Sequence, residues 1–250
     1  MLAAGCGEDE EPAAGGSEPA EPAPPEFGYT GAIGPSEWGE LDSAYSACSK
    51  GSEQSPVDLG DAEPGPVPEI AFAYEPATAT LTNNGHSVEA DLESESSIEV
   101  DGSRYALSQF HYHAPSEHRV GERAFPMELH FVHASPDEEI FVLAALVEAG
   151  EANPAYDDLV DALPAGGGET AKLADPIDPS ELLPPGFADA RHHSYEGSLT
   201  TPPCTEGVGW AVLEQPLELS EGQIASYTSI YSSTNRPLQP LNGRAVQLGR

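Results

Sequence analysis

Three histidines are the residues of this chain whose type and spacing could hold a catalytic metal ion. His111 and His113 are two residues apart, and His130 follows in a second segment with the character of a strand. Side chains alternate between the two faces of an extended chain, so His111 and His113 point the same way. If the two segments are neighbouring strands, three imidazoles converge and leave the fourth position of a tetrahedral Zn²⁺ open. The pattern therefore predicts one catalytic zinc per chain.

Two polar residues are placed to orient these ligands. Gln109 and Glu128 each lie two positions before a histidine, on the same predicted face of its strand. From there a side-chain oxygen can accept the second N–H of an imidazole and fix its tautomer. The competing interpretation is a chance scatter of core or surface histidines. The third histidine and the two acceptors favour the metal site.

The elements that must position these residues are mostly strands. Runs of alternating or β-branched residues predict strands at 70–74, 78–83, 86–92, 97–100, 105–113, 127–133, 140–147, 208–213 and 245–248. Asn84-Gly85 and Asp101-Gly102 are hairpin signals between them. Because connections this short join antiparallel neighbours, we expect a mostly antiparallel sheet.

Helical periodicity is confined to two short pieces. We expect helices at 154–163 and 221–231, the second opened by a capping box of Ser220 and Gln223. The predicted fold class is mainly β: one large twisted, predominantly antiparallel central sheet with short peripheral helices.

The composition divides the chain into two unequal parts. The first 26 residues are rich in Gly, Ala, Pro and Glu and contain no basic or aromatic residue, so we expect 1–26 to be a disordered acidic spacer before one domain at 27–250. The whole chain carries 43 acidic and nine basic residues, a net charge of −34. Such an acidic protein would repel a phosphate backbone, which excludes nucleic-acid binding.

The three cysteines bear on the cellular location of the protein. Cys6 ends the segment Leu2-Ala3-Ala4-Gly5-Cys6, which resembles the end of a bacterial lipoprotein signal peptide, although the basic and apolar regions expected before it are missing. A lipid at Cys6 would be the route to a membrane, because no run of about 20 apolar residues exists. We then expect an extracytoplasmic protein, periplasmic or at the cell surface, with Cys48 and Cys204 as a disulfide. The alternative is an unimportant free thiol at Cys6.

Several further motifs occur in a characteristic order. They are Gly51-Ser52-Glu53-Gln54-Ser55-Pro56-Val57-Asp58, Asn83-Asn84-Gly85-His86, Ser116-Glu117-His118, Glu128-Leu129-His130, Gly197-Ser198-Leu199-Thr200-Thr201-Pro202-Pro203 and the closing segment 236–244. In this order and spread they resemble the α-class carbonic anhydrases, from residue 27 to the C-terminus. The resemblance implies a large twisted sheet with zinc at the bottom of a conical cleft.

The resemblance also implies a reaction, the reversible hydration of carbon dioxide to bicarbonate and a proton by attack of zinc-bound hydroxide. In the family pattern Thr200 accepts a hydrogen bond from the hydroxide and donates its own proton to Glu117, because an ionised carboxylate can only accept. Five residues match the family's substrate pocket, which should be largely apolar for a substrate without a net dipole: Val132, Val142, Leu199, Thr201 and Trp210. For the apolar members, ordinary core packing is the competing interpretation.

His86 matches the family's proton shuttle, a role that suits a side chain with a pKa near neutrality. Tyr29 and Asn84 match residues that order water on the proton path, and Cys48 and Cys204 fit the bridge of secreted members. Phe27 stands near the start, where the commonest animal pattern often has Trp. Sulfonamides and anions are the inhibitors that the resemblance implies, and a homodimer is compatible with it.

The remaining histidines receive structural assignments. By resemblance, His118 and His133 are structural. We expect His192 and His193 to be solvated loop residues, and the alternative is that they approach the rim of the cleft.

Two other functions stay open at this point. The spacing of His111, His113 and Glu117 reproduces half of a cupin metal motif, but the glycines that flank such a motif are missing. A catalytically inactive carbonic-anhydrase-like domain could instead serve as a surface binding module. Domains of that kind usually lose a ligand histidine, and all three are present here.

Overall fold

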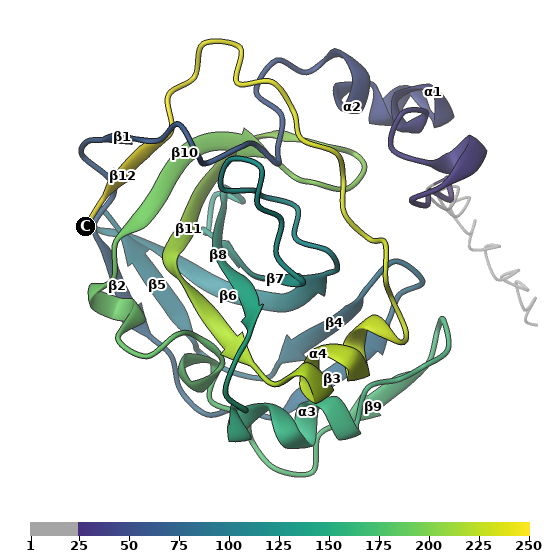
Figure 1. Ribbon diagram of the computed structural model, residues 1–250, viewed down its shortest axis with the longest axis vertical. Helices are drawn as coiled ribbons and strands as arrows, with labels where there is room; N and C mark the ends of the chain where they lie inside the picture. The colour runs from purple at the N-terminus through teal and green to yellow at the C-terminus, as the bar shows by residue number, and fades with distance from the viewer. Residues whose placement is uncertain (1–24) are drawn as a thin grey trace, which may run out of the picture.

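A sheet of 12 strands forms the centre of the structure, a computed structural model that describes residues 25–250 (Figure 1). The strands are β1 (Glu63–Pro64), β2 (Ile70–Ala73), β3 (Ala79–Asn83), β4 (Val88–Leu92), β5 (Ser97–Val100), β6 (Ser103–His113), β7 (Met127–Ala134), β8 (Ile140–Ala149), β9 (Thr170–Lys172), β10 (His192–Ser198), β11 (Glu206–Leu219) and β12 (Gln247–Gly249). Their main order is β1-β12-β10-β11-β8-β7-β6-β4-β3-β9, and β5 joins β2 to β6. The predicted fold class is confirmed.

Most neighbouring strands are antiparallel, as expected from their short connections. β6, β7 and β8 form a continuous antiparallel meander. β8 and β11 run parallel, because the chain between them crosses over and includes β9 and β10, and β1 and β12 are also parallel. The sheet is therefore mixed, although antiparallel pairs predominate.

The helices are short and pack around the sheet. The α-helices are α1 (Trp38–Leu41), α2 (Ala47–Lys50), α3 (Asp157–Asp161) and α4 (Glu221–Thr228), and the 3₁₀ turns are η1 (Gly31–Ile33), η2 (Ser43–Tyr45), η3 (Pro154–Tyr156), η4 (Pro179–Leu182) and η5 (Phe187–Asp189). α1 and α2 lie at the opposite end of the molecule from α3 and α4 (Figure 1). The predicted capping box of Ser220 and Gln223 opens α4, and the helix predicted at 154–163 is divided into η3 and α3.

The sheet separates two hydrophobic clusters, because alternate residues of each central strand face opposite ways. Phe110 and Tyr112 of β6 and Phe131 of β7 pack into the larger cluster. Val142 of β8 and Trp210 of β11 belong to the smaller cluster on the other face. His111, His113 and His130 alternate with the residues of the larger cluster, so they lie on the face of the smaller one.

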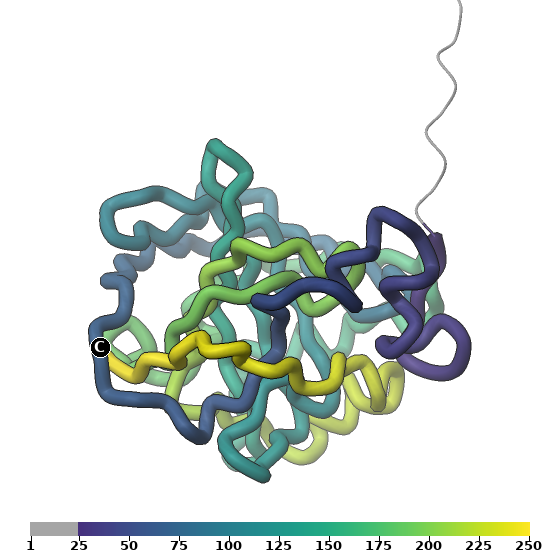
Figure 2. The backbone as a smooth tube through the Cα atoms, turned by 90° about the horizontal axis from the view of Figure 1, so that it is seen from above, coloured from purple at the N-terminus to yellow at the C-terminus, as the bar shows by residue number. Residues whose placement is uncertain are grey.

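A third cluster holds the N-terminal described segment against the rest of the molecule. Trp38 and Tyr45 are buried here beside a disulfide between Cys48 and Cys204, with Phe27 packed against them. The predicted disulfide is confirmed, and it links positions 156 residues apart. The N-terminal segment and the C-terminus lie on opposite sides of the molecule, as both views show (Figures 1 and 2).

The structure corrects the prediction for His192 and His193, which are not solvated loop residues. Both are buried, with exposed fractions of 6% and 5%, in β10. This strand lies between β12 and β11, and Leu213 of β11 faces His192 across the ladder. The sequence prediction missed it because His192–Ser198 has no alternation of apolar and polar residues.

Two strand boundaries also differ for physical reasons. The strand predicted from residue 86 begins at Val88, because the Asn84 side chain accepts the backbone N–H groups of His86 and Ser87 and holds them in a turn. β11 continues to Leu219 beyond the predicted end at 213, through an irregularity between Leu213 and Leu217.

The predictions of a lipid at Cys6 and of a disordered N-terminal spacer concern residues that the structure does not describe. Cys6 and almost all of the spacer predicted at 1–26 lie outside the described residues. Within residues 25–250, no helix has the length and apolar character to cross a membrane.

Candidate active site

The three histidines predicted to bind metal converge in the structure. His111 of β6 lies directly opposite His130 of β7 in the antiparallel ladder, and His113 follows two residues later on the same face. One ring nitrogen from each histidine lies within 4.8 Å of the others, and the Nε2 atoms of His111 and His113 are 3.1 Å apart. The predicted convergence of these imidazoles is confirmed.

Each imidazole is held by an acceptor on its outer nitrogen. Gln109 Oε1 lies 2.8 Å from His111 Nδ1, and Glu128 Oε1 lies 2.8 Å from His130 Nε2, as predicted for both. The backbone carbonyl of Thr234 accepts from His113 Nδ1. These bonds leave Nε2 of His111 and His113 and Nδ1 of His130 to face the centre.

The donor set fits a zinc ion. Four-coordinate zinc with Zn–N distances of about 2.0–2.1 Å places neighbouring nitrogens about 3.3 Å apart. The 3.1 Å separation between His111 and His113 is close to that value. Burial lowers the pKa of both side chains, so they are neutral and their inward lone pairs are available to a cation.

Glu128 is a buried carboxylate that accepts several hydrogen bonds behind the three converging histidines. Its carboxylate lies 2.6 Å from His118 Nδ1 and accepts the backbone N–H groups of Glu117 and His118. Burial alone would raise the pKa of Glu128, but the contacts with His118 and His130 outweigh it and hold that pKa well below its usual range. Glu128 therefore stays ionised and can only accept, which fixes both imidazoles.

The structural assignment of His118 and His133 agrees with their surroundings. His118 Nε2 lies 2.7 Å from the hydroxyl of Tyr195, and His133 lies 2.9 Å from the hydroxyl of Tyr74. Both histidines are fully buried. Each is bound to protein groups through both ring nitrogens, so neither is free for chemistry.

Glu117 presents one free oxygen next to the histidines. Its Oε1 accepts the backbone N–H of Arg236 at 2.8 Å, and its Oε2 lies 3.6 Å from His113 Nε2. Among the described residues Oε2 is buried without a hydrogen-bond partner. Thr200 is also buried, with an exposed fraction of 6%, but no hydrogen bond between Thr200 and Glu117 occurs within residues 25–250. The predicted bond between them stays a prediction, for which Glu117 has an open acceptor.

A cavity of about 270 Å³ opens beside the histidines. Its wall includes His111 and His113 together with the predicted proton-path residues Tyr29, Asn84 and His86. Gln109, Thr201 and Pro202 line it as well. The structure thus brings residues from the N-terminal segment, β6 and the loop after β10 to one volume.

His86 stands half-buried at this cavity. Burial lowers the pKa of His86, and the nearby carboxylate of Glu26 partly opposes that shift. Its imidazole stacks on the ring of Phe27 with centroids 3.8 Å apart. The hydroxyl of Tyr29 is buried and has no hydrogen-bond partner among the described residues.

The apolar residues predicted for the substrate pocket form a row across three strands. Val132 of β7 faces Val142 of β8, which in turn faces Trp210 of β11. Leu199 packs against the same cluster. The Trp210 ring lies 5.1 Å from the ring of His130, between centroids. The row therefore lies beside the converging imidazoles.

Two groups of the site carry no signal in the sequence, and Phe27 is marked there only by a departure from the family pattern. The carbonyl of Thr234, the ring of Phe27 against His86, and Glu89 in the cavity wall all come from distant parts of the chain. A strand-pairing signal could have found Glu89, because it lies opposite His111 between β4 and β6.

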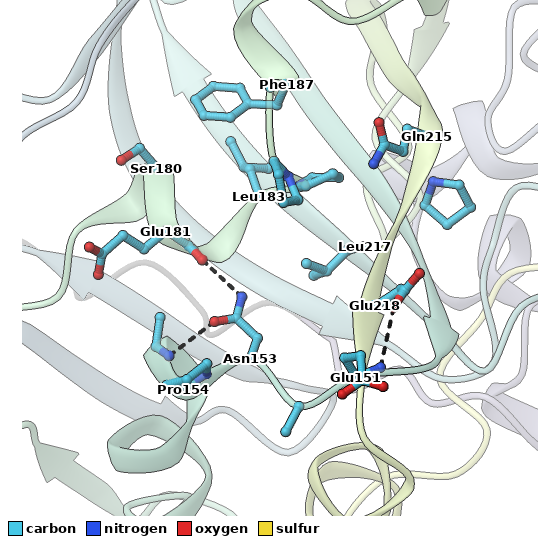
Figure 3. Close-up of a pocket in the computed structure, with 16 residues that line it drawn as sticks. Glu151, Asn153, Pro154, Ser180, Glu181, Leu183, Phe187, Gln215, Leu217 and Glu218 are labelled. Carbon is cyan, nitrogen blue, oxygen red and sulfur yellow. Dashed lines mark hydrogen bonds between the residues drawn. The ribbon is translucent and has the colours of Figure 1, made fainter.

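A larger cavity of about 680 Å³ lies elsewhere, lined by segments around Asn153, Phe187 and Leu217 (Figure 3). Asn153 is engaged by the backbone of Ala155 and Glu181, and the Glu218 carboxylate accepts the N–H of Glu151. No histidine or cysteine lines this cavity within the described residues. His86, His111 and His113 line the cavity of about 270 Å³ instead.

The comparisons with known proteins agree with this geometry. A family model described as eukaryotic-type carbonic anhydrase matches residues 33–249. A curated carbonic anhydrase from Neisseria gonorrhoeae is 40% identical over 222 residues, which cover 88% of this chain and 86% of the relative.

Solved structures show the same likeness. An α-carbonic anhydrase from Thermovibrio ammonificans, in complex with the inhibitor sulfanilamide, is 37% identical with a TM-score of 0.85, and the match covers 91% of this chain and 100% of that one. A dioscorin complexed with ascorbate is 32% identical with a TM-score of 0.81, over 89% of this chain and 97% of that one. The cupin alternative is wrong, because the matched fold is a different one. This chain belongs to the eukaryotic-type, or α-class, carbonic anhydrase family.

Proposed function

We propose that this chain catalyses the reversible hydration of carbon dioxide to bicarbonate and a proton, with one Zn²⁺ held by His111, His113 and His130. The observation that carries the proposal is the convergence of three imidazoles, each held on its outer nitrogen by an acceptor. A bound zinc ion supplies Lewis-acid chemistry that lowers the pKa of water toward neutrality, as it does in carbonic anhydrases generally.

Glu117 and Thr200 orient the attacking oxygen. An ionised Glu117 can only accept, so a Thr200 hydroxyl that reaches its free Oε2 must donate there. The Thr200 oxygen is then left to accept a hydrogen bond from the nucleophile, and the nucleophile's lone pair is directed at the substrate carbon. Arg236 supports this arrangement, because its backbone N–H holds the other Glu117 oxygen.

The apolar row beside the imidazoles receives carbon dioxide. Val132, Val142 and Trp210 are apolar side chains beside the imidazoles, which suits a substrate that has no net dipole, although Val142 and Trp210 are almost fully buried. Leu199 and Thr201 close the pocket from the loop that carries Thr200. Apolar side chains offer water no hydrogen bonds, so a neutral substrate competes less with solvent beside them.

His86 carries the proton from the cavity to solvent. A group with a pKa near 7 releases protons to water only about 10³ times per second, because recombination is limited to about 10¹⁰ M⁻¹s⁻¹. A half-buried imidazole at the cavity wall removes this limit by accepting the proton and passing it to buffer. Asn84 and Tyr29 line the same cavity and can order the intervening water.

The disulfide between Cys48 and Cys204 supports an extracytoplasmic location, because such bonds persist in oxidising compartments. Lipid attachment at Cys6, anion and sulfonamide inhibition, and a homodimer remain parts of the proposal. Sulfanilamide bound to a relative with 37% identity supports the sulfonamide part.

A catalytically inactive binding module is the rival within the same fold, and a related dioscorin was solved with ascorbate. The experiment that separates the two combines metal analysis of the purified chain with stopped-flow hydration of carbon dioxide. We expect one zinc per chain and rapid turnover that sulfanilamide inhibits. Zinc without turnover would favour the binding module, and full occupancy by iron or manganese would contradict the proposed centre. Replacement of a histidine that does not line the cavity beside the imidazoles, as in His192→Gln, should retain zinc and turnover.

A further inference from the structure

Glu89 is a carboxylate in the wall of the active-site cavity with no assigned role. It lies on β4, directly opposite His111 of β6 in the antiparallel ladder. Opposite residues in such a ladder project from the same face of the sheet, with Cβ atoms about 4.5–5.5 Å apart. Glu89 therefore lines the same volume as His111 and His86.

The other two carboxylates near the imidazoles, Glu117 and Glu128, are each bound to protein groups through at least one oxygen, but Glu89 is not. Glu128 is bound by His118 and His130, and Glu117 is held by the backbone of Arg236. Among residues 25–250, the Glu89 side chain forms no hydrogen bond or ion pair, and it is the one carboxylate in the wall of this cavity. No hydrogen-bonding or ion-pairing partner among these residues therefore offsets its charge at the cavity wall.

Glu89 is also no member of the metal-facing cluster. Among residues 25–250, two groups of possible ligand atoms lie within 4.8 Å of one another, and Glu89 belongs to neither: His111, His113 and His130, and His118, Glu128 and His130. The side chain is half-buried, and burial together with the neighbouring Asp91 raises the pKa of Glu89. Partial removal from water lets its charge act over a longer distance than on an open surface.

We propose that Glu89 is a specificity-determining residue that discriminates against anions at the metal centre. This inference rests on the proposed function. Carbon dioxide is neutral, so the carboxylate neither attracts nor repels the substrate, whereas bicarbonate and inhibitory anions carry a charge that it repels. Glu89 thereby favours release of the product of hydration and weakens anion inhibition.

The size of the effect follows from Coulomb's law. A unit charge about 8 Å from a bound anion, at an effective dielectric constant of about 30, weakens the binding of that anion about tenfold. A neutral ligand at the same site should be unaffected.

The test measures binding rather than turnover. The protein is loaded with Co²⁺, whose visible absorption responds to a new ligand, and titrated with sodium thiocyanate at about pH 8.5 and constant ionic strength set with sodium sulfate. The variants are Glu89→Gln, Glu89→Asp, which keeps the charge, and Glu122→Gln, which removes an exposed charge outside the cavity wall. Imidazole, neutral at this pH, is the second ligand, and cobalt stoichiometry reports whether each variant keeps an intact site.

We expect Glu89→Gln to bind thiocyanate about tenfold more tightly than the wild type, with imidazole affinity unchanged. Glu89→Asp and Glu122→Gln should stay within about twofold of the wild type. An unchanged thiocyanate affinity in Glu89→Gln, or an equal gain in Glu122→Gln, would overturn the inference while leaving the metal centre intact. A wild-type protein that takes up no cobalt would overturn the proposed function and this inference with it.

Discussion

The imidazole of His86 lies almost parallel to the ring of Phe27, with ring centroids 3.8 Å apart and 12° between the planes. Phe27 in turn meets Trp38 edge to face, in the cluster that contains the disulfide between Cys48 and Cys204. The N-terminal segment thus supplies a fixed surface for the proposed proton shuttle.

Removing that surface should slow proton transfer but not the hydration step. Stacked aromatic pairs contribute about 0.5–1.5 kcal/mol, so we expect Phe27→Ala to lower kcat about twofold to tenfold through loss of the His86 orientation. The kcat/KM for carbon dioxide should not change, because proton transfer follows product formation. Stopped-flow hydration in low buffer measures both constants.

His86→Ala provides the matched background for that experiment. The kcat of His86→Ala should be lower than that of the wild type and should rise again with added imidazole. In the double variant, Phe27→Ala should lower kcat no further. An equal loss in both backgrounds would show that Phe27 acts on something other than His86.

The acceptor behind His111 should set metal affinity. Gln109 Oε1 holds His111 Nδ1 at 2.8 Å, and loss of such an outer partner typically weakens metal binding about 10–100-fold. We expect Gln109→Ala to show a loss of that order in competition with a zinc chelator. Gln239→Ala, at an exposed amide far along the chain, is the control, and equal affinities in the two variants would contradict the assigned role.

Buried His133 should make the protein less stable in mild acid. Burial lowers the pKa of His133 to about 4, whereas an unfolded histidine titrates near its ordinary value. The unfolded chain therefore binds more protons between about pH 6.5 and 4, and stability falls as pH falls through this window. At pH 5 the loss from this group is about 2 kcal/mol relative to neutral pH.

Urea unfolding of the zinc-loaded protein at pH 7 and pH 5 checks this linkage. His133→Gln should be less stable than the wild type at pH 7, because the packing of His133 against Tyr74 is lost, but its stability should depend less on pH. The same pH dependence in the variant and the wild type would assign the acid sensitivity to other groups.

The disulfide should contribute strongly to stability because it closes a long loop. In the chain-entropy model a bridge across 156 residues stabilises by about 5 kcal/mol, which is an upper figure. We expect the double substitution of Cys48 and Cys204 by Ser to lower Tm markedly. Addition of a reductant should lower the Tm of the wild type and leave that of the double variant unchanged, and a wild-type Tm insensitive to full reduction would refute the contribution.

The features predicted correctly from the sequence depend mostly on local patterns. Alternation in β6 and β7 placed His111, His113 and His130 on shared faces, and the two-residue offset identified Gln109 and Glu128. These relationships need only one strand pair. The motif order that resembles a known family added proposed roles for His86, Glu117 and Thr200, which no local pattern carries and which stay predictions.

What could not be predicted depends on contacts between distant segments. The acceptor for His113 is the backbone carbonyl of Thr234, 121 residues away. Every residue has a backbone carbonyl, so the residue type at 234 does not reveal this contact. β10 is a central strand, but its many polar residues give no strand pattern in the sequence. Tyr195 can be buried there because its hydroxyl forms hydrogen bonds with His118 and Ser55. Parallel pairing of β8 with β11 likewise arises only when the long crossover has folded.

The proposed function requires that nitrogen atoms of His111, His113 and His130 bind one zinc ion. Crystals of the chain purified without added metal, measured on both sides of the zinc absorption edge, test it directly. We expect one anomalous peak at a bonding distance of about 2.0–2.1 Å from all three imidazoles, with no protein oxygen in the fourth position. A map without that peak, or with a carboxylate filling the fourth position, would contradict it.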